Sequence, residues 1–408
     1  MPAMDALPVS LEDIRAAREV LRGIVHETAM EPNRALSEHL GAQVHLKCEN
    51  LQRAGSFKIR GAYTRMSRLS AQEKARGVVA ASAGNHAQGV ALAAQLLGIS
   101  ATVFMPTGAP LPKLAATRGY GADVVLHGTT LDEALVEALA FAERTGAVLI
   151  HPFDHADIVA GQGTCGLEIL EQVPDVKTIV CATGGGGLVA GIAVAVKALR
   201  PDVRIIGVQA EQAAAWPLSL AAGAPVALAS MQTMADGIAV GRPGPVPFSV
   251  VSSLVDEVHT VSEGGLSRAV VMLLERAKLV AEPAGAAAVA WLIESGMPLD
   301  GPVVAVISGG NIDPLLMLRI VRHGLTAAGR FLEIAVQVPD RPGSLARLLA
   351  DLAECQANVI EVNHVRTTAG LAVDEVQIAV ELETRGTAHR QQVLTTLRDK
   401  GYRLVFGS

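Results

Sequence analysis

The sequence predicts an α/β protein built around a mostly parallel sheet. Short runs rich in valine and isoleucine alternate with windows rich in alanine and leucine, a pattern typical of strands joined by helices. Apolar residues make up 50% of the chain and aromatic residues only 3%, so aliphatic side chains must fill the core. At 408 residues the chain exceeds what one core usually supports, and two or more domains are expected.

The first of these domains is expected to span residues 1–325, with a smaller subdomain at about residues 55–150. Its strands are separated mostly by helical windows. They are expected near residues 44–48, 78–82, 101–105, 124–126, 148–151, 178–182, 204–208 and 303–307. Because ligands of open α/β sheets bind at the carboxyl ends of strands, the site is expected in the cleft between the subdomains.

A second domain is expected at residues 331–408, after a linker of small residues at 324–329. The pattern changes there to strand, helix, strand, strand, helix and strand, which is the βαββαβ order of ferredoxin-like domains. The expected elements are strand 331–338, helix 344–355, strands 358–366 and 373–382, helix 388–399 and strand 402–406.

Charge and cysteine usage exclude several classes of protein. The formal net charge is −6 and no basic run marks the chain, so neither nucleic acid nor a membrane surface is an expected partner. The most apolar helical window, residues 188–196, is too short to span a bilayer, and the acidic N-terminus lacks the apolar segment of a signal peptide. The cysteines form no C-x-x-C pair, which favours a reduced cytoplasmic protein; they are Cys48, Cys165, Cys181 and Cys355.

Lys58 stands between Phe57 and Gly61 in the segment Ser-Phe-Lys-Ile-Arg-Gly. A lysine amine becomes a covalent catalyst when it forms an imine with an aldehyde cofactor. A lysine taken at random is more often a solvated residue, here on the first turn of a helix that runs to about Leu69. Two further motifs favour the catalytic interpretation.

The first motif is Ser-Ala-Gly-Asn-His-Ala at residues 82–87, which follows a strand-like run and precedes a helical window. Free amides at a helix start, with Gly84 allowing a close approach, suit a carboxylate or a phosphate. Taken singly, Asn85 is more often a helix cap and His86 a surface residue.

The second motif is Thr-Gly-Gly-Gly-Gly-Leu at residues 183–188, again between a strand-like and a helix-like stretch. Four successive glycines cost more backbone entropy than an ordinary turn requires, and a phosphate cradle of main-chain amides explains them. The spacing fits neither the dinucleotide fingerprint nor a P-loop, and a flexible loop remains the alternative for a lone glycine run.

With Val-Ile-Ser-Gly-Gly-Asn at residues 306–311, these motifs have the order and spacing of fold-type II pyridoxal phosphate (PLP) enzymes. Over about residues 10–325 the chain resembles the threonine ammonia-lyases (threonine dehydratases). Three other segments support the resemblance: Met-Ala-Asp-Gly-Ile at 234–238, Val-Ala-Glu-Pro-Ala-Gly-Ala at 280–286 and Leu-Pro-Lys-Leu-Ala-Ala at 111–116. The turn Asp-Arg-Pro-Gly-Ser-Leu at 340–345 resembles that of ACT domains, which bind amino acids and regulate enzymes.

The resemblance implies a role for each motif. Lys58 would bind PLP through an imine and then act as the general base, Phe57 would pack beside the cofactor ring, and Asn85 would hydrogen-bond its 3-hydroxyl. Ser308 would face the ring nitrogen, which favours elimination over transamination. The phosphate would be held by Gly184, Gly185, Gly186, Gly187 and Leu188, and the substrate carboxylate by Ser82, Ala83, Gly84, Asn85 and His86.

Residue types that related enzymes have and this chain lacks limit the range of expected reactions. Serine racemases of this fold carry a serine where this chain has Ala83, and racemisation needs protons on both faces of Cα, so a one-base site suits elimination. Related enzymes bind a divalent cation after a Gly-Val-Glu segment, whereas here Gln209 is followed by Ala213, Ala214 and Ala215, so no metal is expected.

The expected reaction is deamination of L-threonine to 2-oxobutanoate and ammonia, with L-serine giving pyruvate. An amino-acid effector is expected at Asp340, Arg341, Pro342, Gly343, Ser344 and Leu345, in a homo-oligomer (dimer or tetramer); a plain dimerisation module is the alternative for this domain. A β-replacement enzyme, a serine racemase, a non-catalytic amino-acid sensor and a nicotinamide enzyme remain alternatives for the whole chain.

Overall fold

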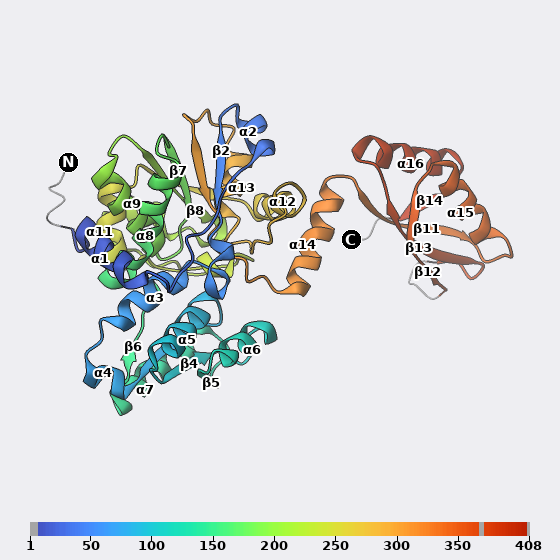
Figure 1. The fold of residues 1–408 in the computed structure, drawn as a ribbon. Coiled ribbons are helices and arrows are strands. Elements are labelled where there is room, and N and C mark those ends of the chain that lie inside the picture. Colours follow the sequence, from blue (N-terminus) through green and yellow to red (C-terminus); the bar gives the residue numbers. More distant parts are fainter. Residues whose placement is uncertain (1–6, 367–370, 406–408) are drawn as a thin grey trace. The chain divides into compact units, whose positions relative to one another are not determined.

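The computed structural model describes residues 7–366 and 371–405 (Figure 1). These residues form two compact units, divided between Pro314 and Leu315. Each unit is built around its own sheets.

The first unit contains a six-stranded sheet in the order β1-β2-β10-β7-β8-β9. All neighbours are parallel except β1 and β2, which are antiparallel. In β7 and β10 every residue is buried, as expected for parallel strands covered by helices on both faces. The strands are β1 (Met30–Pro32), β2 (Val44–Lys47), β7 (Thr178–Ala182), β8 (Arg204–Ala210), β9 (Glu257–Val261) and β10 (Val303–Val306).

A smaller four-stranded sheet has the order β5-β4-β3-β6 and is parallel throughout. Its strands all come from one continuous stretch of the chain, whereas the larger sheet takes strands from both sides of that stretch. They are β3 (Val78–Ala81), β4 (Ala101–Met105), β5 (Asp123–Leu126) and β6 (Val148–Leu149).

Helices of the first unit have clear local signals at their ends. Capping boxes begin α1, α4 and α7, and glycines in the left-handed conformation end α2, α5, α7 and α10. The helices are α1 (Leu11–Leu21), α2 (Arg34–Leu40), α3 (Lys58–Ser67), α4 (Ala71–Arg76), α5 (Asn85–Leu97), α6 (Leu111–Gly119), α7 (Leu131–Thr145), α8 (Ala156–Gln172), α9 (Gly187–Leu199), α10 (Ala215–Ala222), α11 (Pro245–Leu254), α12 (Glu263–Met272) and α13 (Ala287–Glu294). Short turns of other helix types are η2 (Glu49–Leu51), η3 (Arg53–Gly55), η4 (Glu211–Ala213), η5 (Asp236–Ile238) and η6 (Leu273–Ala277).

Helix α8 lies between α9 and α3 and so connects the helices that carry the predicted site motifs. The approach of α8 to α9 is close because glycines face each other: a Cβ atom on Gly163 would lie 2.8 Å from the carbonyl oxygen of Gly191. The aliphatic core of the large sheet surrounds this contact, and a second core lies between α3, α5 and the small sheet. The predicted aliphatic filling is confirmed.

The second unit begins at Leu315, the second residue of α14 (Pro314–Ala327), and continues with a four-stranded antiparallel sheet in the order β12-β13-β11-β14. Alternate residues of β11 are buried against α15 and α16, so both helices cover one face of the sheet (Figure 1). The elements are β11 (Phe331–Pro339), α15 (Ser344–Glu354), β12 (Asn358–Val365), β13 (Glu375–Glu383), α16 (Thr387–Asp399) and β14 (Arg403–Val405).

The predicted α/β class and the C-terminal βαββαβ order are both confirmed. Two strands were not predicted: β1 contains a proline, and β9, of sequence Glu-Val-His-Thr-Val, is a half-polar edge strand. The last predicted strand extended to residue 406, which lies outside the described residues. Within the described part of the chain, no helix has the length and apolar character needed to cross a membrane.

Candidate active site

Lys58 is the first residue of α3, and its backbone surroundings are fixed by the turn at residues 306–311. Ser56 forms an isolated β-bridge with Gly309, and the amide of Phe57 donates to the carbonyl oxygen of Ser308 over 3.3 Å. The Nζ atom of Lys58 donates to the carbonyl oxygen of Pro152 over 3.0 Å. The predicted lysine and the predicted serine turn are therefore neighbours.

The amine of Lys58 is in an environment that favours its neutral form. Burial lowers the pKa of Lys58 from 10.5 to about 8, although the nearby charge of Glu282 acts in the opposite direction. A lysine with this lowered pKa has a far larger neutral fraction near neutral pH than an ordinary lysine, and the neutral amine is the nucleophile and the base.

Asn85 is held on both sides of its amide. Its Oδ1 accepts from Nδ2 of Asn311 over 2.8 Å, and its Nδ2 donates to Oε1 of Glu282. Asn311 also donates to the carbonyl oxygen of Ala54, so this hydrogen-bonded chain joins α5 to the loop before Lys58. The motif at residues 280–286 thus contributes Glu282 to the site, a residue without a role in the sequence prediction.

Glu282 carries the clearest sign of a missing partner. It is 2% exposed, and among the described residues no atom forms a hydrogen bond with its Oε2. Burial, followed by the charge of Asp236, raises the pKa of Glu282 to about 7. An orphaned buried carboxyl oxygen is costly, which indicates that a bound molecule completes the site.

The glycine loop, residues 183–188, passes between bulky side chains. A Cβ atom on Gly185 would overlap the ring of Phe153, and one on Gly186, whose φ is +96°, would overlap Trp216. The indole nitrogen of Trp216 donates to the carbonyl oxygen of Gly184 over 2.7 Å. Only glycine fits at these two positions, and the loop backbone is thereby fixed.

Besides α3, which starts at Lys58, two helices begin at the site without a side-chain cap. Helix α5 starts after Gly84 and α9 starts after Gly186, and in neither case does a side chain accept from the first amides. The capping boxes of α1, α4 and α7 contrast with this. Uncapped amides at a helix start favour an anionic group, so the site offers two anion cradles, one for each predicted motif.

The predicted substrate turn, residues 82–86, is partly engaged within the protein. The amide of Gly84 donates to Oγ of Ser82 over 3.1 Å, and Nε2 of His86 lies 2.7 Å from the carbonyl oxygen of Ile150. Burial lowers the pKa of His86 to about 3, so its ring stays neutral. The His86 side chain therefore supports the turn, and its free contribution to the site is the amide at the start of α5.

A buried charge network next to the site has no counterpart in the sequence prediction. Arg60, two residues after Lys58, pairs with Glu49 and Glu168, and Lys47 also pairs with Glu168. The two positive and two negative charges of this network cancel, and its ion pairs connect α3 to α8 and β2 to α8. The two pairs made by Glu168 join residues more than 100 positions apart, so no local signal in the sequence reveals them.

The side chain of Gln209, in the segment where no metal is expected from the sequence, is engaged within the protein. Oε1 of Gln209 accepts from the amide of Trp216 over 2.8 Å, and its Nε2 donates to the carbonyl oxygen of Ala213 over 3.2 Å. Throughout residues 7–366 and 371–405, no group of three or more His, Cys, Asp or Glu side chains is arranged to hold a metal ion.

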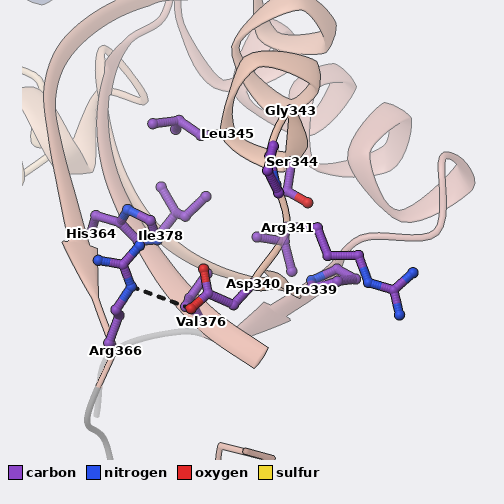
Figure 2. A pocket seen from close by; sticks show the side chains of 12 residues that line it. Pro339, Asp340, Arg341, Gly343, Ser344, Leu345, His364, Arg366, Val376 and Ile378 are labelled. Carbon is purple, nitrogen blue, oxygen red and sulfur yellow. Dashed lines mark hydrogen bonds and ion pairs between the residues drawn. The ribbon is translucent and has the colours of Figure 1, made fainter. Parts of the chain in front are cut away.

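The second unit contains a pocket of about 310 Å³ that includes the predicted effector turn (Figure 2). Residues 340–345 form one side of the pocket. The other lining residues are His364 on β12, Arg366 just after β12, and Val376 and Ile378 on β13. Arg366 pairs with Asp340 over 3.3 Å. These strand residues were not predicted, because they lie far from the turn in sequence.

The donor set of the first unit fits PLP. The site has an amine suited to imine formation, which matches the aldehyde of the cofactor. Its two uncapped helix starts suit a phosphate and a carboxylate, and its orphaned carboxyl oxygen suits a polar ring substituent. The fold and the site thus define the class of an α/β enzyme with a PLP-type site.

Comparison with known proteins agrees with this class. The model of the family "Pyridoxal-phosphate dependent enzyme" matches residues 21–309. An L-threonine ammonia-lyase of Thermotoga maritima is 48% identical over 97% of this chain and 98% of that protein. The chain therefore belongs to the pyridoxal-phosphate dependent enzyme family, as its sequence motifs predicted.

Solved structures extend the likeness to the fold. Threonine deaminase isoform 2 of Solanum lycopersicum, in its processed form, superposes with a TM-score of 0.72 at 40% identity, covering 76% of this chain and 86% of that one. Maize serine racemase superposes with a TM-score of 0.73 at 34% identity, covering 78% of this chain and 98% of that one.

Proposed function

We propose that this chain is a PLP-dependent L-threonine ammonia-lyase, which converts L-threonine to 2-oxobutanoate and ammonia and also converts L-serine to pyruvate. The observation that carries the proposal is the position of Lys58, an amine with a pKa of about 8, in the same site as Asn85 and the glycine loop. The threonine ammonia-lyase of Thermotoga maritima, which matches nearly the whole chain, supports the choice of substrate.

When bound, PLP supplies an aldehyde for imine formation and a ring that withdraws electrons from Cα. Lys58 would hold it covalently, Phe57 would pack beside the ring, and Asn85 would bond its 3-oxygen. Ser308, which is 5% exposed, would face the ring nitrogen. The phosphate would be held by the amides of Gly184, Gly185, Gly186, Gly187 and Leu188 at the uncapped start of α9.

Lys58 would carry out the proton transfer. Once the substrate amine has replaced it, the Lys58 amine is free and uncharged, and it removes the Cα proton of threonine as a general base. The carboxylate of the substrate is oriented meanwhile by the amides of residues 82–86. The β-hydroxyl then leaves as water, and hydrolysis of the unsaturated product gives the keto acid and ammonia.

Ala83 favours elimination over racemisation. It is partly exposed at the turn, and its methyl group has no proton to deliver to the face of Cα opposite Lys58. The site then has one base, which suits the loss of a β-substituent.

The experiment that tests this function is an assay of the purified, PLP-loaded protein on L-threonine and L-serine. Release of 2-oxobutanoate and pyruvate, with ammonia in equal amounts, is expected. Turnover that requires an added thiol and yields a replacement product would identify a β-replacement enzyme instead. Absence of both reactions, in a protein that binds amino acids, would favour the sensor alternative.

We also infer a regulatory role for the second unit. Residues 1–325 would form the catalytic domain, with a smaller subdomain at about 55–150, and residues 331–408 an ACT-type domain. The pocket at residues 340–345 supports this, since α15 begins after Gly343 without a side-chain cap and could receive the carboxylate of an amino-acid effector.

Feedback of this kind would suit an allosteric enzyme of amino-acid metabolism, such as isoleucine biosynthesis, working as a homo-oligomer. A cytoplasmic location is supported by the cysteines, each of which is free and buried.

A further inference from the structure

Two of the motifs shared with threonine ammonia-lyases meet in an ion pair that the proposed mechanism does not use. Nζ of Lys113, on α6, lies 2.5 Å from Oδ2 of Asp236, in η5. The two residues are 123 positions apart, and α6 packs against α5, the helix that begins at the substrate turn. The pair therefore connects α6, on the side of the substrate turn, to η5.

Burial of the pair is strongly asymmetric. The side chain of Lys113 is 8% exposed, whereas that of Asp236 is 57% exposed. An ammonium group taken out of water requires a close partner, but an aspartate on the solvent side needs none. The arrangement therefore stabilises the position of the lysine rather than that of the aspartate.

Lys113 lies beside the predicted carboxylate turn. A Cβ atom added to Gly84 would be 4.0 Å from Nζ of Lys113. The charges of Lys113 and Asp236 also reach Glu282, whose pKa is raised by burial and by Asp236 and lowered by Lys113. The ammonium is thus within the group of residues that surrounds Asn85 and Glu282.

We propose that Lys113 is the cation that recognises the substrate carboxylate at residues 82–86, and that Asp236 positions and neutralises Lys113, so that the site accepts a single carboxylate. This rests on the proposed function, since it assigns the counter-ion of the amino-acid substrate. An ammonium has three donors, so Lys113 can keep its bond to Asp236 while it donates to the substrate.

The two partners then have different roles, which a purely structural ion pair would not give them. If the pair only held α6 against η5, loss of either partner would leave the preference for a carboxylate over an amide unchanged, although loss of Asp236 would cost more stability because it leaves a buried ammonium unpaired. If Lys113 binds the carboxylate, its loss weakens carboxylate binding, whereas loss of Asp236 leaves a free cation that attracts carboxylates more strongly.

The test compares L-2-aminobutanoate, which lacks the β-hydroxyl and cannot eliminate, with its primary amide. Both are titrated against the PLP-loaded protein, and binding is followed by the absorbance change of the cofactor. The variants are Lys113→Met, Lys113→Gln and Asp236→Asn. Lys197→Met is the matched control, because Lys197 also pairs with an aspartate, Asp256, and its side chain is 10% exposed.

Wild type should prefer the carboxylate to the amide. In Lys113→Met and Lys113→Gln this preference should fall about 10- to 100-fold, as expected for the loss of one charge-assisted hydrogen bond, with little change in amide affinity. Asp236→Asn should retain or increase the preference and should bind L-aspartate several-fold more tightly than wild type. Lys197→Met should match wild type in both respects.

An unchanged preference in Lys113→Met, or equal losses in Lys113→Met and Asp236→Asn, would overturn the assignment of Lys113, and unchanged aspartate affinity in Asp236→Asn would overturn the neutralising role of Asp236. The proposed function fails separately: a wild-type protein that shows the carboxylate preference but releases no 2-oxobutanoate from threonine would reject the lyase activity and keep the role of Lys113. Thermal melting of each variant shows whether it is folded.

Discussion

Asn311 donates a hydrogen bond of 2.8 Å from its Nδ2 to Oδ1 of Asn85, although 226 residues separate them in the sequence. With its oxygen occupied in this way, Asn85 must point its Nδ2 into the site, where it donates to Glu282. The second hydrogen of the same nitrogen is then available to the 3-oxygen of PLP. If Asn85 binds PLP as proposed, Asn311 is expected to act through it as a positioning residue.

We expect Asn311→Ala to weaken PLP binding about fivefold, because the Asn85 amide loses its orienting partner and a net hydrogen bond contributes roughly 1 kcal/mol. Equilibrium dialysis of the cofactor measures this directly. Asn363→Ala is the matched control, since Asn363 also donates a hydrogen bond from its side-chain amide but lies on β12 of the second unit. Equal PLP affinity in wild type and Asn311→Ala would contradict the positioning role.

The sequence motifs indicated some residues of this candidate site but not the importance of others. Lys58, Asn85, the glycine loop and Ser308 stand in motifs whose residue types already indicate their chemistry. Glu282 lies within a quoted motif, but its significance depends on burial and on an unsatisfied oxygen, and neither property is visible in a sequence.

Long-range pairs account for most of what was missed. Arg60 with Glu168, and Asp340 with Arg366, each join segments that only the fold brings together. The pattern of apolar runs placed most strands of both units within a few residues. Strand β9 was missed because an edge strand buries little, so its apolar periodicity is weak.

The second prediction concerns Lys58 itself. Lys58→Ala removes both the imine-forming amine and the general base, so formation of 2-oxobutanoate should fall by at least about 10²- to 10⁴-fold, the usual contribution of a general base. The variant should also lose the absorbance band of covalently bound PLP. Lys74→Ala, at a lysine whose Nζ donates to the carbonyl oxygen of Ser67, should keep wild-type turnover. Undiminished turnover by Lys58→Ala would reject the assignment.

The third prediction follows from the lowered pKa of Lys58. Because the neutral amine attacks the aldehyde, the rate at which cofactor-free protein recombines with PLP should rise with pH and reach half its maximum near pH 8, well below the 10.5 of an ordinary lysine. Glu282 raises the pKa of Lys58 through its charge, so Glu282→Gln should move this midpoint to lower pH. Comparing the two proteins in the same buffers cancels the titration of PLP. A midpoint that stays constant or rises in Glu282→Gln would show that the charge of Glu282 does not act on Lys58.

The fourth prediction concerns the choice between elimination and racemisation. Ala83→Ser places a hydroxyl on the turn that would receive the substrate carboxylate, and a proton donor there should introduce some racemisation of serine while PLP stays bound. Chiral analysis of serine recovered from the reaction measures this. If no D-serine forms above the wild-type level, the residue at position 83 does not by itself decide between the two reactions.

The last prediction concerns the second unit, whose sheet and helices pack around a core of their own. A chain that ends at Ala328 should keep PLP and threonine deamination but lose its response to amino-acid effectors, because coupling requires a second binding site. In the full-length protein, Arg366→Met should weaken the effector response by removing the partner of Asp340 in the pocket, whereas Arg385→Met, at an arginine bonded to Gln356, should not. Initial rates with each amino acid as effector, together with the mass of each protein in solution, decide the outcome. Identical kinetics of the full-length and shortened proteins, with only the shortened one falling apart into smaller oligomers, would make the second unit an assembly module and end the regulatory interpretation.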